Sequence, residues 1–304
     1  MKALVTGGAG FIGSHVVDAY LDAGHDVAIV DDLSSGRREN LNPKARFHET
    51  DICTDALADV FDQEQPEIVC HLAAQMDVTR SVADPRFDAR VNVLGLIRLL
   101  ELSVQHGVKR LIFSSTGGAI YGAAKEYPAT EETRPEPMSP YAVSKFSGEE
   151  YIKMFGRVHG LRYVILRYTN VFGPRQMPHG ECGVCAVLTN LMLAGRQPTL
   201  YGFGKPIRDY VYVGDVARAN LLASEKGENQ TLNISTGRPT TVMDIFNALR
   251  EVIGFEQDPI LKPLRPGEVE RSLAVNARAA EALGWTPTVD LLEGLRRTVA
   301  AMGR

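Results

Sequence analysis

The chain has 304 residues, of which 44% are hydrophobic and 23% charged, an ordinary composition for one large globular domain or two fused ones. Its formal net charge of -4 provides no basic field that would attract nucleic acid or an acidic membrane. No apolar run reaches the ~18 residues needed to span a bilayer. Glycine at position 7 interrupts the N-terminus too early for a secretory signal. We therefore expect a cytoplasmic protein that binds neither nucleic acid nor membranes.

Four cysteines do not make a disulfide framework in a chain of this length. Cys182 and Cys185 form a lone C-x-x-C pair. A metal site would need a second ligand pair, and none occurs at a recognisable spacing. We interpret the two cysteines as small apolar residues and expect no metal, with a redox pair or half a metal site as the alternative.

Strands and helices alternate up to about residue 170. The apolar runs are nearly continuous, as is typical of parallel strands covered on both faces. This alternation predicts an α/β fold, a doubly wound parallel sheet of the Rossmann type. We expect strands at Lys2–Thr6, Val27–Asp31, Phe47–Asp51, Ile68–Leu72, Arg110–Ser114 and Tyr163–Tyr168, and helices at Ile12–Ala23, Phe87–His106 and Tyr141–His159.

Beyond residue 170 the elements are shorter and loops are more frequent. A helix ending near Gly195, strands at Tyr210–Val213 and Leu232–Ser235, and helices near Val242–Val252, Ala277–Leu283 and Leu291–Ala301 are expected there. They predict a smaller, interwoven C-terminal α/β substrate domain. The Rossmann domain would comprise residues 1–168 plus about 211–235, and the second domain about 169–210 plus 236–304.

The helix expected at Phe87–His106 is apolar almost all the way round. Such a helix needs cover on more than one side. Burial within the monomer is one interpretation, and a helix pair at a homodimer interface is the interpretation we favour.

A glycine turn follows the first strand and opens the first helix. Gly7, Gly10 and Gly13 give the pattern G-x-x-G-x-x-G, with Phe11 and Ile12 inside it. Such a turn lets the backbone approach a diphosphate at a helix N-terminus, where free N–H groups and the helix dipole favour anions. Because the turn lies between a strand and a helix, it predicts a dinucleotide site rather than a plain tight turn.

Asp31 ends the second strand, where a carboxylate can accept hydrogen bonds from the adenosine ribose hydroxyls. It would also repel the additional phosphate of NADP. Arg37 and Arg38 follow and could in principle bind that phosphate. Asp31 is better placed, so NAD is the expected cofactor.

Tyr141 and Lys145 lie four residues apart at the start of a helix, and therefore on one face. A tyrosine with a pKa of ~10 is a poor base at neutral pH. A nearby ammonium group and a positive nicotinamide would both lower that pKa. Thr116 leaves a strand at the ligand-binding edge of the sheet, where it can donate a hydrogen bond to the oxygen being oxidised.

Together these motifs resemble the extended short-chain dehydrogenase/reductases, and specifically the UDP-galactose 4-epimerases, over nearly the full length. The segments that carry the resemblance are Thr6–Gly13, Asp51–Ile52, His71–Gln75, Ser114–Gly122, Tyr141–Lys145, Arg167–Arg175, Ile207–Val211 and Arg265–Glu268.

The resemblance implies roles for individual residues. Around the cofactor it implies Ser35 and Gly36 near the adenosine ribose, Asp51 and Ile52 at the adenine, and Ala73, Gln75, Asn92, Ser114 and Tyr168 toward the nicotinamide. For the substrate it implies Asn170, Arg208 and Arg265 at the diphosphate, Thr199 and Tyr201 at the uracil, and Val184 and Cys185 as lining. A salt bridge from Arg208 to Asp209 is the alternative for that arginine.

The turn after Thr116 favours one reaction. Related dehydratases carry an acidic residue there, and related decarboxylases usually carry a glutamate, whereas this chain has Gly117, Gly118 and Ala119. No side chain in that turn can move a proton. The resemblance therefore implies C4 epimerisation of a UDP-sugar, with Tyr141, Lys145 and Thr116 as catalytic residues and NAD regenerated in each cycle.

Three further expectations concern the substrate and its alternatives. The position that lines the sugar pocket in the family aligns to Ser272, and this small residue leaves room for N-acetyl sugars. A UDP-glucuronate 4-epimerase or decarboxylase is the first alternative, with Arg80 as a loose candidate for holding the sugar carboxylate. A non-catalytic NAD-binding protein is the second, although such proteins commonly lose the tyrosine or the lysine.

Overall fold

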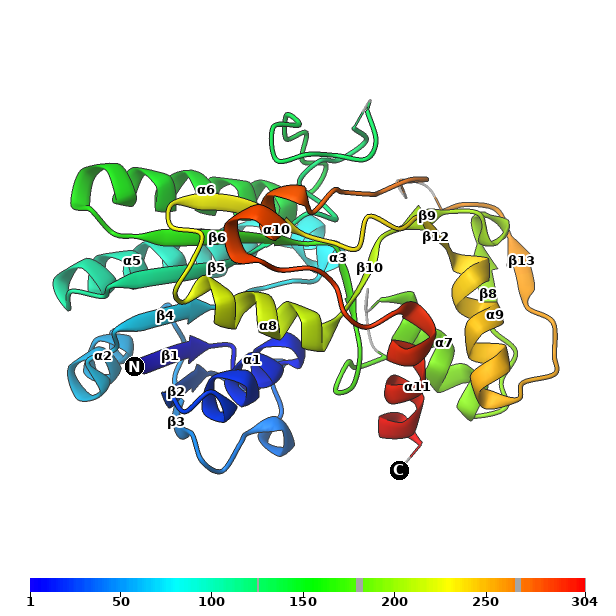
Figure 1. Cartoon of the computed structure of the whole chain (residues 1–304), viewed down its shortest axis with the longest axis horizontal. Coiled ribbons are helices and arrows are strands. Elements are labelled where there is room, and N and C mark those ends of the chain that lie inside the picture. Colours follow the sequence, from blue (N-terminus) through cyan, green and yellow to red (C-terminus); the bar gives the residue numbers. More distant parts are fainter. Residues whose placement is uncertain (125, 179–182, 266–268, 304) are drawn as a thin grey trace.

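The protein is described here by a computed structural model that covers residues 1–124, 126–178, 183–265 and 269–303. Seven strands form a parallel central sheet in the order β11-β6-β5-β4-β1-β2-β3 (Figure 1). They are β1 (Lys2–Thr6), β2 (Asp26–Asp31), β3 (Arg46–Glu49), β4 (Ile68–His71), β5 (Arg110–Thr116), β6 (Tyr163–Tyr168) and β11 (Gln230–Ile234). The strand order reverses between β1 and β4, which is where ligands bind in doubly wound folds.

The predicted Rossmann sheet is therefore confirmed, with strand ends that differ by at most two residues. The strand at Tyr163–Tyr168 has the bounds that we expected. The strand expected at Phe47–Asp51 runs from Arg46 to Glu49, because the chain turns at Asp51. Buried parallel strands give long apolar runs, and for this reason the sequence pattern located them well.

Helices cover both faces of the sheet (Figure 1). One face carries α1 (Phe11–Asp22), α8 (Val213–Ala223) and α10 (Ala277–Leu283), and the other carries α2 (Ala56–Glu64), α5 (Gly95–Gln105) and α6 (Pro140–His159). Tyr20 and Trp285 are fully buried on the first face, and Phe61 and Phe113 on the second. The two layers hold the carboxyl ends of the strands in a fixed arrangement.

The other elements form a second lobe with its own core around Phe172, Leu200 and Phe246 (Figure 1). Three pairs of short strands lie there or beside it: β7 (Asn170–Phe172) with β10 (Tyr210–Tyr212), β8 (Thr199–Tyr201) with β13 (Ile260–Lys262), and β9 (Ile207–Arg208) with β12 (Thr240–Thr241). The helices are α7 (Val184–Leu193), α9 (Val242–Ile253) and α11 (Leu291–Met302), with the short turn η3 (Gly202–Gly204) packed against β8 and β13. The short helix α3 (Val78–Ala83) and the turn η1 (Arg38–Asn40) lie elsewhere in the chain.

Two segments lie in a different part of the structure from the one that we expected. Helix α10 and Trp285, expected in the second domain, pack into the core against the central sheet. Strand β10, expected to open the return to the Rossmann domain, pairs with β7 outside the central sheet. The division of the chain into two domains stays a prediction.

The helix expected at Phe87–His106 is confirmed as one continuous helical segment, but it is not α-helical throughout. The segment forms α4 (Pro85–Ala89), a π-helical turn η2 (Arg90–Leu94) and then α5. Such a turn inside a helix frequently marks a functional site, and here it carries the buried Asn92. Leu96, Leu99 and Leu100 are fully buried, whereas Leu94 is 61% exposed.

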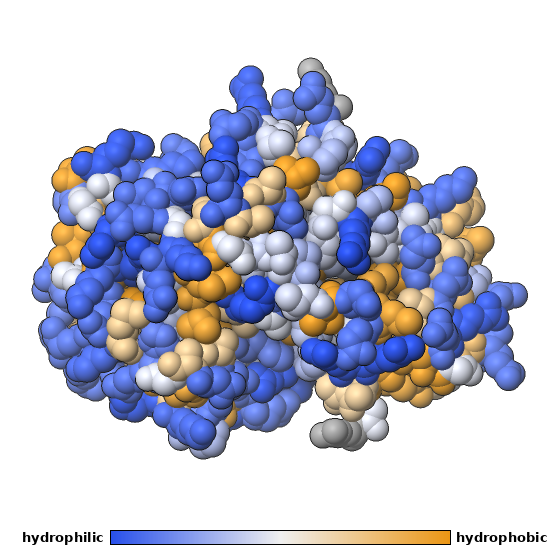
Figure 2. All heavy atoms as spheres, viewed as in Figure 1, coloured by the Kyte–Doolittle hydropathy of each residue, from blue (hydrophilic) through white to orange (hydrophobic). Residues whose placement is uncertain are grey.

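Polar side chains cover most of the face shown in Figure 2, with apolar areas over the second lobe. None of the helices in the described parts of the chain is long and apolar enough to cross a membrane.

Candidate active site

The glycine turn after β1 is packed too closely for side chains. A Cβ atom on Gly7, whose φ is +73°, would lie 2.7 Å from the Ala73 nitrogen, and one on Gly13 would lie 2.0 Å from the Gly7 oxygen. Helix α1 begins directly after the turn without a side-chain cap. Within the described chain, no acceptor receives the N–H groups of Phe11 and Ile12. Free donors at a helix N-terminus suit a diphosphate, so the turn fits a dinucleotide.

Asp31 lies at the end of β2 beside this turn. Its buried carboxylate accepts hydrogen bonds from the Ala9 N–H at 3.0 Å and the Leu33 N–H at 2.9 Å. Burial raises the pKa of Asp31, and these two hydrogen bonds act in the opposite direction. A Cβ atom on Gly36 would lie 2.6 Å from the Asp31 Oδ1 atom. Gly36 is therefore the residue that keeps the chain close to the carboxylate, while the neighbouring Ser35 is exposed.

The two arginines that could bind a further phosphate are already paired. Arg37 contacts Glu39 at 2.6 Å, and Arg38 contacts Glu49. Both pairs are exposed, so each contributes little to stability. They nevertheless give both guanidinium groups a carboxylate partner, which favours NAD over NADP.

The loop after β4 is held by Asn92. Its side-chain amide exchanges two hydrogen bonds with the backbone of Gln75 and also donates to Asp88 and Ser144. Asn92 therefore fixes the backbone of the loop that contains Ala73 and Gln75. The two residues expected at the adenine lie just beyond β3. Asp51 is partly exposed and accepts a hydrogen bond from the Cys53 N–H, whereas Ile52 is buried against Gly95.

The three expected catalytic residues lie at the carboxyl end of β5 and the start of α6. Thr116 is the last residue of β5, Tyr141 lies in the first turn of α6, and Lys145 follows one turn later. The Lys145 Nζ atom donates to the Ser114 carbonyl oxygen at 2.9 Å and lies 4.9 Å from the centre of the Phe113 ring. The Ser139 side chain caps α6 by accepting from the Ala142 N–H, which fixes where the helix begins.

The direction of the Tyr141 pKa in the chain itself is opposite to our expectation. Burial and the nearby Asp88 carboxylate raise the pKa of Tyr141 to about 12, and the Thr116 hydroxyl acts in the opposite direction. Burial also lowers the pKa of Lys145 to about 8, although the charges of Asp88 and Glu149 oppose this. In the chain without cofactor, desolvation disfavours the charged forms of both residues.

The turn after Thr116 contains no acid. The Thr116 Oγ1 atom accepts from the Ala119 N–H at 3.2 Å, and the Gly117 N–H donates to the Tyr168 carbonyl oxygen at 2.7 Å. The Tyr168 side chain points into the core, where its hydroxyl accepts a hydrogen bond from Asn220. The turn is thus fixed by backbone contacts and offers one hydroxyl, that of Thr116.

Asn170 and Arg208 lie beside each other on β7 and β9. The Asn170 amide donates to the Asp209 carbonyl oxygen, and Arg208 donates to the carbonyl oxygens of Ile207 and Val269. The alternative of a salt bridge from Arg208 to Asp209 is wrong. The Asp209 carboxylate accepts instead from the backbone and side chain around Thr236, because the two side chains leave the strand on opposite sides.

The remaining expected substrate residues occupy different surroundings. The Arg265 guanidinium lies 3.8 Å from the centre of the Tyr201 ring, on the strand that begins at Thr199. Ser272 is buried, and its N–H donates to the Ile207 carbonyl oxygen.

The two residues of α7 that were expected to line the substrate site differ in exposure. Val184 is partly exposed, whereas Cys185 is fully buried in the core of the second lobe. Burial raises the pKa of the Cys185 thiol, which does not suit a nucleophile. Cys182, the other half of the C-x-x-C pair, and residues 266–268 of the motif that begins at Arg265 lie outside the described residues.

Four buried polar residues next to this site had no role in our expectations: Asp88, Ser115, Glu149 and Arg167. Glu149 follows Lys145 by four residues, as Lys145 follows Tyr141, so all three share one face of α6. Extending that spacing by one step would have placed Glu149 on the same helix face, although it would not have shown its burial or its pairing with Arg167.

Comparison with known proteins identifies the same fold and one family. The profile of the NAD-dependent epimerase/dehydratase family matches residues 3–235. A UDP-glucose 4-epimerase of Mycolicibacterium smegmatis is 43% identical over 98% of this chain and 97% of its own length.

Two solved structures are closely similar. The UDP-glucose 4-epimerase of Thermotoga maritima with UDP-glucose is 51% identical, with a TM-score of 0.97 over 99% of this chain and 98% of that one. The enzyme of Thermus thermophilus in complex with NAD is 44% identical, with a TM-score of 0.93 and the same coverage. The chain therefore belongs to the NAD-dependent epimerase/dehydratase family.

Proposed function

We propose that this chain is an NAD-dependent epimerase that inverts C4 of UDP-glucose and UDP-galactose. The observation that carries the proposal is the position of Thr116, Tyr141 and Lys145 beside an acid-free turn and next to a turn fitted to a dinucleotide. The names of the similar proteins support it, since UDP-glucose 4-epimerases cover nearly the whole chain.

In the proposed reaction, the Tyr141 oxygen takes the proton from the sugar 4-hydroxyl and later returns it. The Thr116 hydroxyl would hold the same sugar oxygen, and the hydrogen bond to the Ser114 carbonyl oxygen holds the Lys145 ammonium group one turn after Tyr141. Arg208 and Arg265 would bind the diphosphate while the sugar turns over, as guanidinium groups can hold phosphate oxygens in pairs. When bound, NAD supplies the hydride acceptor and donor, together with a positive charge close to Tyr141.

That positive charge has a specific consequence for Tyr141. Because burial raises the pKa of Tyr141 to about 12, the phenol of the chain alone is protonated at neutral pH. A cation brought close to the phenol favours the phenolate. Proton removal is therefore expected only in the complete site.

The acid-free turn argues against the related reactions. Elimination or decarboxylation chemistry in this family uses an acidic residue close to the catalytic hydroxyl, and Gly117, Gly118 and Ala119 provide none. Arg80, the loose candidate for a sugar carboxylate, is stacked 4.1 Å from the centre of the Phe87 ring on the outside of α4. The presence of both Tyr141 and Lys145 argues against a non-catalytic binding protein.

The decisive experiment is nuclear magnetic resonance of the purified protein incubated with UDP-galactose. The wild type should form UDP-glucose, and Tyr141→Phe should be slower by about 100-fold or more, the usual contribution of a positioned acid-base group. Equal rates for the two proteins would overturn the proposal.

Acceptance of N-acetyl sugars is a finer part of the proposal. The support is the small side chain of Ser272, which is buried where its N–H contacts Ile207. UDP-GlcNAc should be epimerised under the conditions in which UDP-glucose reacts, and Ser272→Tyr should abolish the reaction of the N-acetyl sugar alone. Failure of the wild type to convert UDP-GlcNAc would refute this part.

A homodimer is the second finer part. Large apolar side chains are exposed on η2 and α6, which pack against each other: Leu94, Val143, Tyr151 and Val158. A second copy could cover this surface, since exposed apolar areas commonly mark interfaces. Light scattering should show a dimer for the wild type and a monomer for Leu94→Glu with Val143→Glu. The cytoplasmic location stays a prediction from the sequence.

A further inference from the structure

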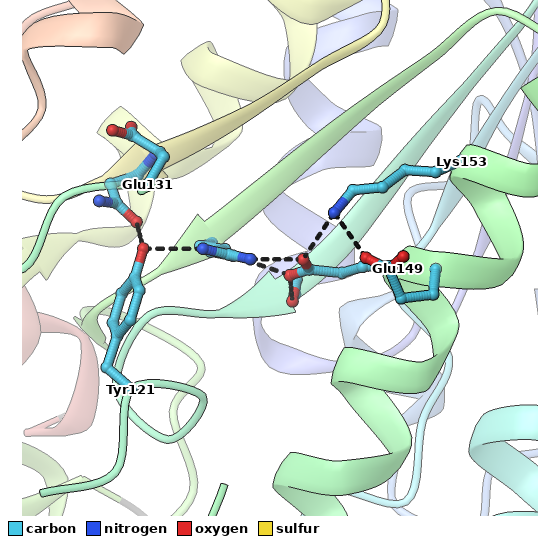
Figure 3. A network of polar contacts seen from close by, with 8 residues as sticks. Tyr121, Glu131, Glu149 and Lys153 are labelled. Carbon is cyan, nitrogen blue, oxygen red and sulfur yellow. Dashed lines mark hydrogen bonds and ion pairs between the residues drawn. The ribbon is translucent and has the colours of Figure 1, made fainter. Parts of the chain in front are cut away.

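A buried network of charges links the strand before the catalytic turn to the catalytic helix (Figure 3). The Glu149 carboxylate and the Arg167 guanidinium form a two-pronged pair, with distances of 2.9 Å to Nε and 2.6 Å to the terminal nitrogen. Glu149 is completely buried, and Arg167 is 3% exposed. Lys153 lies at the outer edge of the network, 3.9 Å from Glu149.

The network holds both ends of the turn that carries Thr116. At one end the Ser115 hydroxyl, one residue before Thr116, donates to Glu149 at 2.6 Å. At the other end the Tyr121 hydroxyl accepts from Arg167 at 3.0 Å and donates to Asn233 at 2.7 Å. Figure 3 shows Tyr121 and Glu149 on opposite sides of the guanidinium group. The turn between Ser115 and Tyr121 is therefore anchored twice to one buried ion pair.

The same pair is anchored to the helix that carries the other catalytic residues. Glu149 lies on α6, one turn after Lys145 and two turns after Tyr141. Arg167 lies on β6, next to Tyr168, whose carbonyl oxygen also accepts from the turn at Gly117. The turn that carries Thr116 and the helix α6 are therefore both held by the same Glu149–Arg167 pair.

We propose that Glu149 and Arg167 are positioning residues that set the placement of Thr116 relative to Tyr141 through Ser115 and Tyr121. The inference rests on the proposed epimerase function. Its physical basis is that a buried, hydrogen-bonded ion pair restricts the arrangement of the groups that are bonded to it. A misplacement of about 1 Å between reacting groups can cost about 100-fold in rate.

Removing a partner of the pair itself is a poor test. It would leave an uncompensated buried charge, which typically costs about 3–5 kcal/mol and could unfold the protein. Ser115→Ala and Tyr121→Phe instead each remove one link to the turn and leave the Glu149–Arg167 pair intact. Ser103→Ala is the matched control, because the Ser103 hydroxyl is equally buried but bonds only to the Leu99 carbonyl oxygen in α5.

The experiment measures kcat, KM and the melting temperature for each variant with UDP-galactose. We expect Ser115→Ala and Tyr121→Phe to lower kcat by about 10-fold, because each frees one end of the turn. KM should stay within about 2-fold, since the diphosphate is bound elsewhere. Ser103→Ala should lose a similar amount of thermal stability without any loss of kcat.

A double-variant cycle distinguishes positioning from general destabilisation. If Ser115 acts through Thr116, Ser115→Ala should slow the wild type but add no further loss to Thr116→Ala. Multiplicative losses, or a kcat of Ser115→Ala equal to that of the wild type, would overturn the inference while leaving the proposed function in place. A wild type that inverts no UDP-sugar would overturn the function and this inference together.

Discussion

Asn92 and Gln75 are joined by a reciprocal pair of hydrogen bonds. The Gln75 N–H donates to the Asn92 Oδ1 atom at 2.8 Å, and the Asn92 Nδ2 atom donates to the Gln75 carbonyl oxygen at 2.8 Å. The Asn92 side-chain amide thus pairs with the Gln75 backbone as a neighbouring strand would, and it fixes the loop after β4. The π-helical turn is what brings Asn92 inward to that loop, because a regular helix would rotate the side chain by a different angle.

Asn92→Asp tests this arrangement. The introduced carboxylate keeps the acceptor for Gln75 but loses the donor, and it would lie about 3 Å from the Asp88 carboxylate. Like charges raise the folded-state pKa of the introduced group above its unfolded value. The resulting penalty is small in acid and appears as pH rises through that raised pKa.

We therefore expect the loss in free energy of unfolding, relative to the wild type, to be larger at pH 8 than at pH 5. Urea titrations at both values measure it. Asn92→Ala is the control, since it has no charge and its loss of about 1–3 kcal/mol should not depend on pH. A loss for Asn92→Asp that is the same at both pH values would contradict the arrangement.

Lys145→Met should raise the stability of the cofactor-free protein and abolish its epimerase activity. Burial lowers the pKa of Lys145 to about 8, so the folded chain holds this proton less tightly than the unfolded chain, whose lysine pKa is ~10.4. Below pH 8 both states are protonated, and the full penalty for burying the charge is present. Between pH 8 and about pH 10.4 the folded lysine loses its proton first, so the stability of the wild type rises.

The cofactor-free Lys145→Met protein should therefore be more stable than the wild type at pH 7 by about 1–3 kcal/mol, with the gain shrinking toward pH 10. It should be inactive as an epimerase. Lys109→Met, which removes a surface ion pair with Glu67, should show neither change. A Lys145→Met protein that is less stable than the wild type at pH 7 would refute the argument.

The sheet could be predicted from sequence because its strands are continuous apolar runs between helical segments. The glycine turn and the spacing of Tyr141 and Lys145 could be predicted for a similar reason, since both are local patterns. The family resemblance supplied the residues that are far apart in the chain, such as Arg208 and Ser272.

The buried network could not be predicted, because it depends on contacts between distant segments. In sequence Glu149 resembles any carboxylate on a solvated helix face, and only the packing of α6 on β6 brings it to Arg167. The direction of the Tyr141 pKa in the cofactor-free chain could not be predicted either, because the pattern showed a nearby ammonium group but not the extent of burial. The network depends on long-range contacts and the Tyr141 pKa on desolvation, and a residue pattern contains neither.

Asp31 and Glu49 should together control the choice between NAD and NADP. Asp31→Ala would remove the carboxylate expected to bind the ribose and repel a further phosphate. Glu49→Gln would release Arg38 from its ion pair. We expect Asp31→Ala to weaken NAD binding by about 10- to 100-fold, since a charged hydrogen bond contributes about 1.5–3 kcal/mol.

The double variant should bind NADP more tightly than Asp31→Ala does, because Arg38 can then reach a phosphate. Calorimetric titration with both cofactors measures these changes. Glu39→Gln, which changes the pair with Arg37 instead, shows whether Arg38 is the arginine involved. Tighter binding of NADP than NAD to the wild type would overturn the assignment of the cofactor.

Replacing Gly13 by alanine should lower the stability of the fold, whereas replacing Gly10 by alanine should mainly lower NAD binding. A Cβ atom on Gly13 would lie 2.0 Å from the Gly7 carbonyl oxygen, and backbone at both positions cannot move aside. Gly13→Ala should therefore destabilise the fold by about 3 kcal/mol or more. A Cβ atom on Gly10 has only the Gly7 oxygen within 4 Å, at 3.1 Å, and the extended backbone of Gly10 is open to any residue.

Gly10→Ala should therefore fold with a melting temperature within a few degrees of the wild type. Its methyl group would nevertheless stand at the N-terminus of α1, where the backbone must approach a diphosphate. The purified variant should carry much less NAD, as measured by absorbance after denaturation. If Gly10→Ala retained NAD as the wild type does, the diphosphate would not lie on this turn, and the two glycines would have only a structural role.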